Sequence, residues 1–86
     1  MLQKIGDRVS VNLLYDHVKG ISIPRAIKWN KTVYTIEKLG LHYTLYRGKT
    51  LIHMFSVCDN THFFLLSFNT SSLNWILEET ADNTVN

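Results

Sequence analysis

Residues able to do chemistry are concentrated in residues 51–68, LIHMFSVCDNTHFFLLSF. This stretch contains the chain's only cysteine, Cys58, together with His53 and His62, among large apolar side chains. A thiolate and an imidazole can form a nucleophilic pair, and both can bind a transition metal. The segment is therefore a candidate reactive site, a candidate metal site, or the apolar core of the domain.

A metal site is disfavoured by the spacing of the four histidines, His17, His42, His53 and His62. They form no H-x-H or H-x₃-H pattern, and no C-x₂-C pair accompanies them. With Asp59-Asn60 as a two-residue turn, His53 faces Leu66, four residues along the strand from His62. At ~3.3 Å per residue the two imidazoles would stand roughly 13 Å apart. We predict no metal ligands and no cofactor.

Catalysis is disfavoured by the surroundings of Cys58. It would face His62 only across a three-residue turn, and that register spoils the apolar matching with residues 73–77. The neighbouring Asp59 supplies no positive charge that would lower the pKa of the thiol. The adjacent Glu78 and Glu79 would point to opposite faces of a strand, so they cannot act as an acid–base pair. The sequence has no G-x-S-x-G motif and no complete phosphate loop. We predict no catalytic residues and a protein that is not an enzyme.

Length and composition indicate one small globular domain. Eighty-six residues, 45% of them hydrophobic, can bury one core. No apolar run approaches the ~20 residues of a membrane helix, and the N-terminus lacks the apolar stretch of a signal peptide. A single cysteine cannot form an internal disulfide. We expect a cytoplasmic protein without a membrane partner.

The elements read mainly as strands, because β-branched and aromatic residues dominate and there is a single proline. Apolar residues alternate through residues 8–16, which favours a strand. A helix between Ser10 as N-cap and Gly20 as stop is the alternative for residues 10–19. Residues 25–36 predict a hairpin around Asn30-Lys31, with Trp29 opposite Thr32 and Ile27 opposite Tyr34. Lys31 is a poor residue for this turn, since a type I′ turn needs positive φ at both central positions.

A second hairpin is predicted across a three-residue loop, Arg47–Lys49. This loop would pair Leu45 with Leu51, Tyr43 with His53, and Leu41 with Phe55. Gly40 would separate its first strand from the preceding one.

The last third of the chain gives the clearest pattern. A turn at Asp59-Asn60 pairs Cys58 with Thr61, and a four-residue loop at residues 69–72 pairs Phe68 with Leu73 and Leu66 with Trp75. These registers place one apolar set on a single face: Leu51, His53, Phe55, Val57, His62, Phe64, Leu66, Phe68, Leu73, Trp75 and Leu77. A helix over residues 72–82 is the alternative, but its acidic last turn has the wrong charge for a helix C-terminus.

These elements predict an all-β fold, an antiparallel meander of about six or seven short strands that curls into a small barrel or a curved sheet. The domain would span residues 1–79, with a polar tail at residues 80–86. The second face of the sheet is also apolar, which often marks an interface. We predict a homodimer or protein-partner interface there, made by Ile52, Met54, Phe63, Leu65 and Ile76.

Charge is distributed unevenly along the chain. The net charge is +2, yet residues 19–49 carry seven basic residues and one acidic residue, whereas residues 50–86 carry four acidic residues and no basic ones. Basic and aromatic residues together suit single-stranded nucleic acid. The candidate nucleic-acid surface comprises Arg25, Lys28, Trp29, Lys31, Tyr46, Arg47 and Lys49. The alternative is that neighbouring acidic strands neutralise these charges.

A resemblance accompanies these patterns. Pro24, Ile27, Trp29 and Tyr34, followed by Phe68-Asn69 and by Trp75, Leu77 and Asp82, resemble the pattern of a group of small bacterial proteins. The turn after the tryptophan in that group usually carries Gly and Arg, where this chain has Asn30 and Lys31. The resemblance implies an all-β fold and no assigned activity.

The sequence thus predicts a small non-enzymatic binding module. It would self-associate or bind a protein partner through the apolar sheet face. The alternative is a nucleic-acid-binding accessory module that uses residues 25–49.

Overall fold

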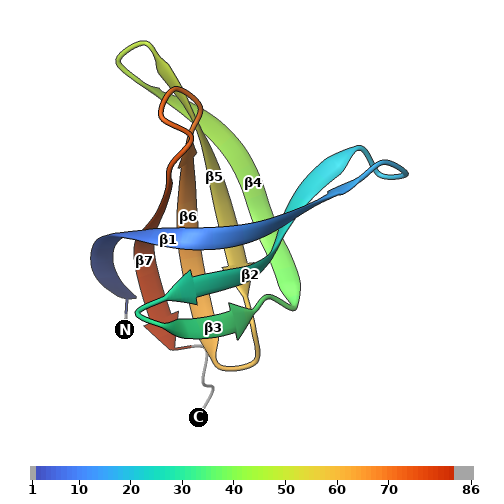
Figure 1. Ribbon diagram of the computed structural model, residues 1–86, viewed down its shortest axis with the longest axis vertical. Coiled ribbons are helices and arrows are strands. Elements are labelled where there is room, and N and C mark those ends of the chain that lie inside the picture. Colours follow the sequence, from blue (N-terminus) through green and yellow to red (C-terminus); the bar gives the residue numbers. More distant parts are fainter. Residues whose placement is uncertain (1, 83–86) are drawn as a thin grey trace.

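The computed structural model describes residues 2–82, which form one antiparallel sheet of seven strands (Figure 1). The strands are β1 (Leu2–Asp16), β2 (Ile21–Trp29), β3 (Thr32–Thr35), β4 (Lys38–Arg47), β5 (Thr50–Cys58), β6 (His62–Asn69) and β7 (Trp75–Asp82). Their order across the sheet is β3-β2-β1-β7-β6-β5-β4. The predicted all-β fold is confirmed, and the sheet is curved rather than closed into a barrel.

Strand β1 joins the two halves of the sheet. Its first part pairs with β7, from Leu2 opposite Ala81 to Val9 opposite Trp75. Its second part pairs with β2, from Ser10 opposite Lys28 to Asp16 opposite Ile21. Register shifts interrupt both ladders, and β1, β2 and β3 cross in front of β4–β7 (Figure 1). The strand prediction for residues 8–16 is confirmed, and the helical alternative is wrong.

The core lies between these two halves. Ile27 and Ile36 come from the front half and pack against Phe55, Val57, Phe64, Leu66 and Leu77 of β5–β7. The predicted assignment of these β5–β7 residues to one buried face is confirmed. Burying one such side chain contributes about 1.5–3 kcal/mol.

The β2–β3 hairpin has the predicted register. Trp29 lies opposite Thr32 and Ile27 opposite Tyr34. Asn30 and Lys31 both adopt left-handed backbone conformations, with φ of 50° and 67°, as a type I′ turn requires.

The predicted register of the β4–β5 hairpin is wrong by one residue. Arg47 pairs with Thr50, so the turn is Gly48-Lys49, and Gly48 supplies the positive φ of 61°. Thr44 rather than Tyr43 lies opposite His53, and His42 lies opposite Phe55. A one-residue slip moves every side chain of a strand to the other face. Gly40 also lies within β4, at a register shift between Leu39 and Leu41, and does not end the strand.

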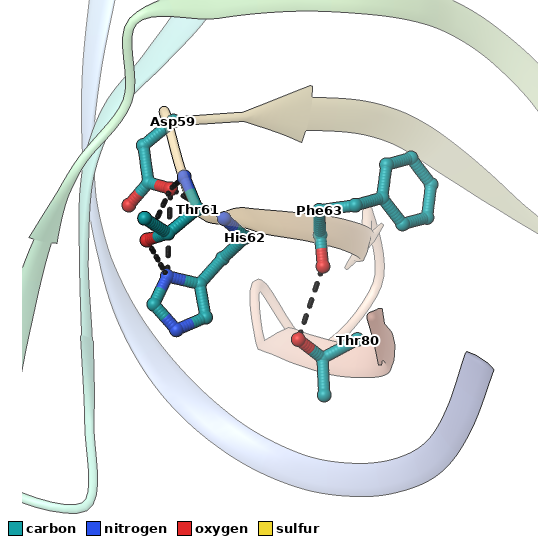
Figure 2. Close-up of polar contacts among 5 residues, drawn as sticks. All are labelled: Asp59, Thr61, His62, Phe63 and Thr80. Carbon is teal, nitrogen blue, oxygen red and sulfur yellow. Dashed lines mark hydrogen bonds and ion pairs between the residues drawn. The ribbon is translucent and has the colours of Figure 1, made fainter. Parts of the chain in front are cut away.

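The predicted register of the β5–β6 hairpin is wrong by two residues. The Asp59 carboxylate accepts hydrogen bonds from the backbone N–H groups of Thr61 (2.8 Å) and His62 (2.6 Å), as Figure 2 shows. This arrangement stabilises a longer loop, and Cys58 pairs with Phe63 instead of Thr61. An even shift leaves every side chain on its predicted face, which explains why the core assignment is nevertheless right.

The β6–β7 loop is also longer than predicted. Phe68 pairs with Trp75 and Leu66 with Leu77, because the Asn69 side chain accepts hydrogen bonds from the backbone of Ser71 and Ser72. Leu73 was expected on the core face, but it lies in the loop with a φ of 61° and is 68% exposed. The helical alternative for residues 72–82 is wrong, because β7 occupies most of that range.

Strand β7 continues to Asp82. The Thr80 hydroxyl donates a hydrogen bond to the carbonyl of Phe63 at 3.0 Å (Figure 2). Residues 80–82 of the expected polar tail therefore belong to the sheet, and residues 83–86 lie outside the described residues.

The left-handed conformation of Lys31 makes this residue a site for stabilisation. A non-glycine residue in the left-handed conformation destabilises the folded protein by roughly 1–2 kcal/mol. Lys31→Gly removes this strain, but glycine also makes the unfolded chain more flexible, which offsets part of the gain. We expect Lys31→Gly to raise the free energy of unfolding in urea by about 0.5–1 kcal/mol. Lys49→Gly is the matched control, since Lys49 is not left-handed, and it should give no gain. Equal effects of the two substitutions would contradict this explanation.

Asp59 gives a second stability prediction. Burial raises the pKa of this carboxyl, but the N–H donors of Thr61 and His62 and the charge of His62 outweigh burial, so its pKa is lowered from the ordinary 3.8. The stabilisation is therefore present above about pH 3.8 and is lost as the pH falls through the folded-state pKa. Asp59→Ala should cost about 1–2 kcal/mol at pH 7, measured by urea unfolding, and Asp59→Asn, which keeps an acceptor oxygen, should cost less. A cost for Asp59→Ala that is the same at pH 7 and at about pH 2 would refute this role.

Candidate functional site

The most distinctive surface feature is a cleft beneath the projecting part of the β1–β2 hairpin. We call this part of the hairpin, residues 11–24, the arm; it extends past the body of the sheet in Figure 1. The cleft has a volume of about 280 Å³, and we call it the arm cleft. The arm contributes Leu13, Gly20, Ile21 and Ser22, and the body contributes His42, His53, Phe55, Phe68 and Trp75.

Local hydrogen bonds set the course of the arm. The Asp16 carboxylate accepts hydrogen bonds from the backbone N–H groups of Val18 (3.0 Å) and Lys19 (3.2 Å). Gly20, with a φ of 68°, donates its N–H to the Asp16 carbonyl at 2.8 Å. Because these bonds close the turn, Ile21 returns directly opposite Asp16. The arm thereby places Leu13 and Ile21 at the arm cleft.

Stacked aromatic rings form the body side of the arm cleft. The rings of His42 and Phe55 are nearly parallel, 8° apart, with centroids separated by 4.2 Å. Phe55 contacts Trp75 at 5.4 Å, and Trp75 contacts Phe68 at 4.8 Å. Such offset and tilted arrangements are the favoured geometries of aromatic pairs. The stack therefore fixes a continuous aromatic wall from β4 to β7.

Two imidazoles meet at the edge of this wall. His42 Nε2 lies 2.8 Å from His53 Nδ1, so one ring donates its proton and the other accepts it. Phe55 covers one face of the His42 ring, while the rest of that ring is exposed. This partial burial, followed by repulsion from a charged His53, lowers the pKa of His42 from the ordinary 6.5. The lowered pKa favours the uncharged form of His42 at neutral pH, so this ring is a polar but uncharged group at the edge of an apolar cleft.

Sequence reasoning missed this pair because of the β4–β5 register. The predicted loop placed Tyr43 opposite His53 and sent His42 to the other face. A usable signal was Gly48, because glycine favours a two-residue hairpin turn such as Gly48-Lys49. That turn brings His42 and His53 to one face on neighbouring strands.

The candidate nucleic-acid residues do not form one surface. Lys28, Trp29 and Lys31 lie at the β2–β3 turn, and Tyr46, Arg47 and Lys49 lie at the β4–β5 turn, at the far end of the molecule (Figure 1). The Trp29 indole donates a hydrogen bond to Asp7 at 3.0 Å and packs against the core. The Arg47 guanidinium lies 3.4 Å from the Glu78 carboxylate. Arg25 lies apart from both groups, at a second cleft beside β4.

The candidate interface residues lie on the back of β5–β7. Ile52 and Met54 are 2% and 4% exposed, and Phe63, Leu65 and Ile76 are half-buried. Ser67 donates a hydrogen bond to Glu78 on this face, and Glu78 also pairs with Arg47. The arm carries apolar side chains with greater exposed fractions: Leu14, Tyr15 and Val18 are 50%, 62% and 82% exposed.

Cys58 and His62 have separate surroundings. Cys58 lies opposite Phe63 in the β5–β6 ladder. His62 Nδ1 lies 2.7 Å from the Thr61 hydroxyl, and the ring contacts Tyr34 and Phe64. Among residues 2–82 no three histidine, cysteine or acidic side chains gather as metal ligands. The same residues contain no helix that could cross a membrane.

The histidine pair predicts a pH dependence of stability. Because the folded-state pKa of His42 is lowered, the unfolded chain takes up a proton first as the pH falls below about 6.5, and stability is lost. His42→Phe keeps an aromatic ring on Phe55 and removes this titration. We expect the urea midpoint of the wild type to fall relative to that of His42→Phe between about pH 7.5 and about pH 5.5. His53→Gln should reduce this fall without abolishing it, since burial of His42 persists. Parallel pH profiles of the urea midpoint for all three proteins would contradict a lowered folded-state pKa of His42.

Comparisons with family models, with curated proteins and with solved structures found no match to this chain. The function is therefore inferred from the geometry and chemistry of the described residues.

Proposed function

We propose that this chain is a non-enzymatic protein-binding module, and that the arm cleft is its binding site. The arm cleft carries this proposal, because it is apolar, walled by fixed aromatic rings, and bordered by exposed apolar side chains of the arm. Large exposed apolar patches commonly mark protein interfaces. Anchor residues of a partner characteristically fill such pockets at the centre of an interface.

The size of the arm cleft supports a side chain as its occupant. Its volume of about 280 Å³ lies just below the range of about 300–1,000 Å³ typical of small-molecule pockets. It is large enough for one or two big apolar side chains. The hydrogen-bonded imidazoles of His42 and His53 offer a polar group beside them, which suits a peptide with an apolar anchor and a nearby polar atom.

The chemistry of the arm cleft supports binding rather than catalysis. Ser22 supplies the hydroxyl group of the cleft, and the two imidazoles hydrogen-bond each other. Across residues 2–82, no hydrogen bond joins Ser22 to either imidazole, so a serine–histidine nucleophile is not assembled there.

A cytoplasmic location, suggested by the single cysteine, belongs to the same proposal.

The other two candidate surfaces have weaker support. On the back of β5–β7, Ile52 and Met54 are buried and therefore unavailable to a partner. The Arg47–Glu78 ion pair also lies on this face. The basic and aromatic residues expected to bind nucleic acid are divided between two ends of the molecule. Self-association through the back of β5–β7 and nucleic-acid binding are therefore the less supported alternatives to this proposal.

The test is selection of binders from a displayed library of random peptides. We expect selected peptides to share a large apolar residue and to bind Ser22→Trp, which fills the arm cleft, about tenfold or more weakly. Thr35→Trp, on exposed β3 outside the cleft, is the matched control and should bind as the wild type does. Urea unfolding checks that both variants are folded. The proposal fails if no peptide is selected, or if Ser22→Trp binds selected peptides with unchanged affinity.

A further inference from the structure

We propose that the partner binds as an extended acidic segment, which adds a strand to the outer edge of β4 and places apolar side chains in the clefts beside it. This inference rests on the proposed function, and it names the chemistry and the binding mode of the partner.

The sheet leaves the edge of β4 open. Within residues 2–82, β4 has a hydrogen-bonded neighbour only on its β5 side, so one side of a ten-residue strand is unpaired. Unpaired edges readily accept another strand. Part of β2 is open as well, because β3 pairs only with Ala26–Trp29, which leaves Ile21–Pro24 with β1 as its one neighbour.

Two clefts open beside these edges. The arm cleft reaches from Ile21 and Ser22 of β2, past His42 of β4, to the aromatic wall on the face of β5–β7. A second cleft, of about 310 Å³, reaches from Ile21 and Ile23 of β2 to Ile36 and Leu39. The two clefts share Ile21, so they adjoin each other beside the first residues of β2. An extended segment repeats its side chains about every 6–7 Å on one face, which suits successive apolar residues in successive clefts.

The charge around the second cleft favours an acidic occupant. Lys19, Arg25 and Lys38 line it, against Glu37 alone. All four side chains are exposed. Electrostatic complementarity of this kind selects partners and raises association rates. An acidic segment would gain these contacts, and a basic one would be repelled.

The same charges disfavour a second copy of this chain as the occupant. Antiparallel pairing of two β4 edges would bring Lys38 of one copy toward Arg47 and Lys49 at the other end of its partner's strand. Like charges opposite each other destabilise strand pairing, and lysines on an edge strand are a known protection against self-pairing. The occupant we infer is thus a segment of another protein in which acidic and apolar residues alternate, bound by strand addition.

The experiment uses the whole chain and a capped peptide, Asp-Leu-Glu-Phe-Asp-Leu-Glu, followed by ¹⁵N NMR and fluorescence anisotropy. We expect amide shifts concentrated in residues 38–43 and 21–23. Affinity should fall about tenfold or more when lysine replaces the acidic residues, and it should weaken as salt rises from about 50 to about 500 mM. Methylating the backbone nitrogens on one edge of the peptide should abolish binding, and methylating the other edge should not.

Protein variants complete the test. Lys38→Glu should weaken binding of the acidic peptide about tenfold. Lys4→Glu, on an exposed part of β1 that lines neither cleft, is the matched control and should leave binding unchanged. Equal affinities for acidic and basic peptides, or no effect of methylation on either edge, would overturn the inference. Stronger binding of a single-stranded oligonucleotide at β4 would also overturn it.

The two proposals fail in different ways. If library-selected peptides depend on the arm cleft but show neither acidic preference nor shifts at β4, the proposed function stands and this inference falls. If the acidic peptide binds at β4 and Ser22→Trp has no effect, the strand addition at β4 stands, whereas the proposed function and the placement of an apolar side chain in the arm cleft both fall.

Discussion

The double pairing of β1 is the constraint on which the rest of the structure depends. One fifteen-residue strand pairs with β7 along its first part and with β2 along its second. The front strands must therefore cross the β4–β7 face, and the apolar residues of both halves meet there. The same pairing holds the arm away from the body and leaves β2 and β4 unpaired with each other. Core, cleft and open edge thus follow from one strand with two partners.

The period-two geometry of strands decides how much could be predicted from the sequence. The β5–β6 register was wrong by two residues, yet Phe55, Phe64 and Leu66 were assigned to the correct face, because an even error preserves alternation. The β4–β5 register was wrong by one residue, so His42 was assigned to the wrong face and its pairing with His53 was missed. Face assignments therefore tolerate even errors in loop length and fail with odd ones.

Loop lengths were the hardest feature to predict, because side chains within the loops determine them. Asp59 and Asn69 each accept two or more backbone hydrogen bonds, and each thereby extends a loop beyond the shortest turn that the apolar pattern allows. Asp16 acts in the same way at the end of the arm. Asp and Asn are common at such positions because their oxygens bond the backbone two or three residues ahead. The arm cleft itself was beyond sequence reasoning, since it depends on how far the sheet curves.

The β1–β7 ladder also has a consequence for how the chain is made. Leu2 pairs with Ala81 and Val9 with Trp75, so the first part of β1 cannot form its ladder before β7 is available. Contacts between residues so distant in sequence form slowly, because a long loop must close before they gain any energy. During synthesis the hairpins β2–β3, β4–β5 and β5–β6 can form as they emerge, whereas residues 2–9 stay unpaired until β7 has left the ribosome. We therefore expect the β1–β7 ladder, which joins the two halves of the sheet around the core, to form late in folding.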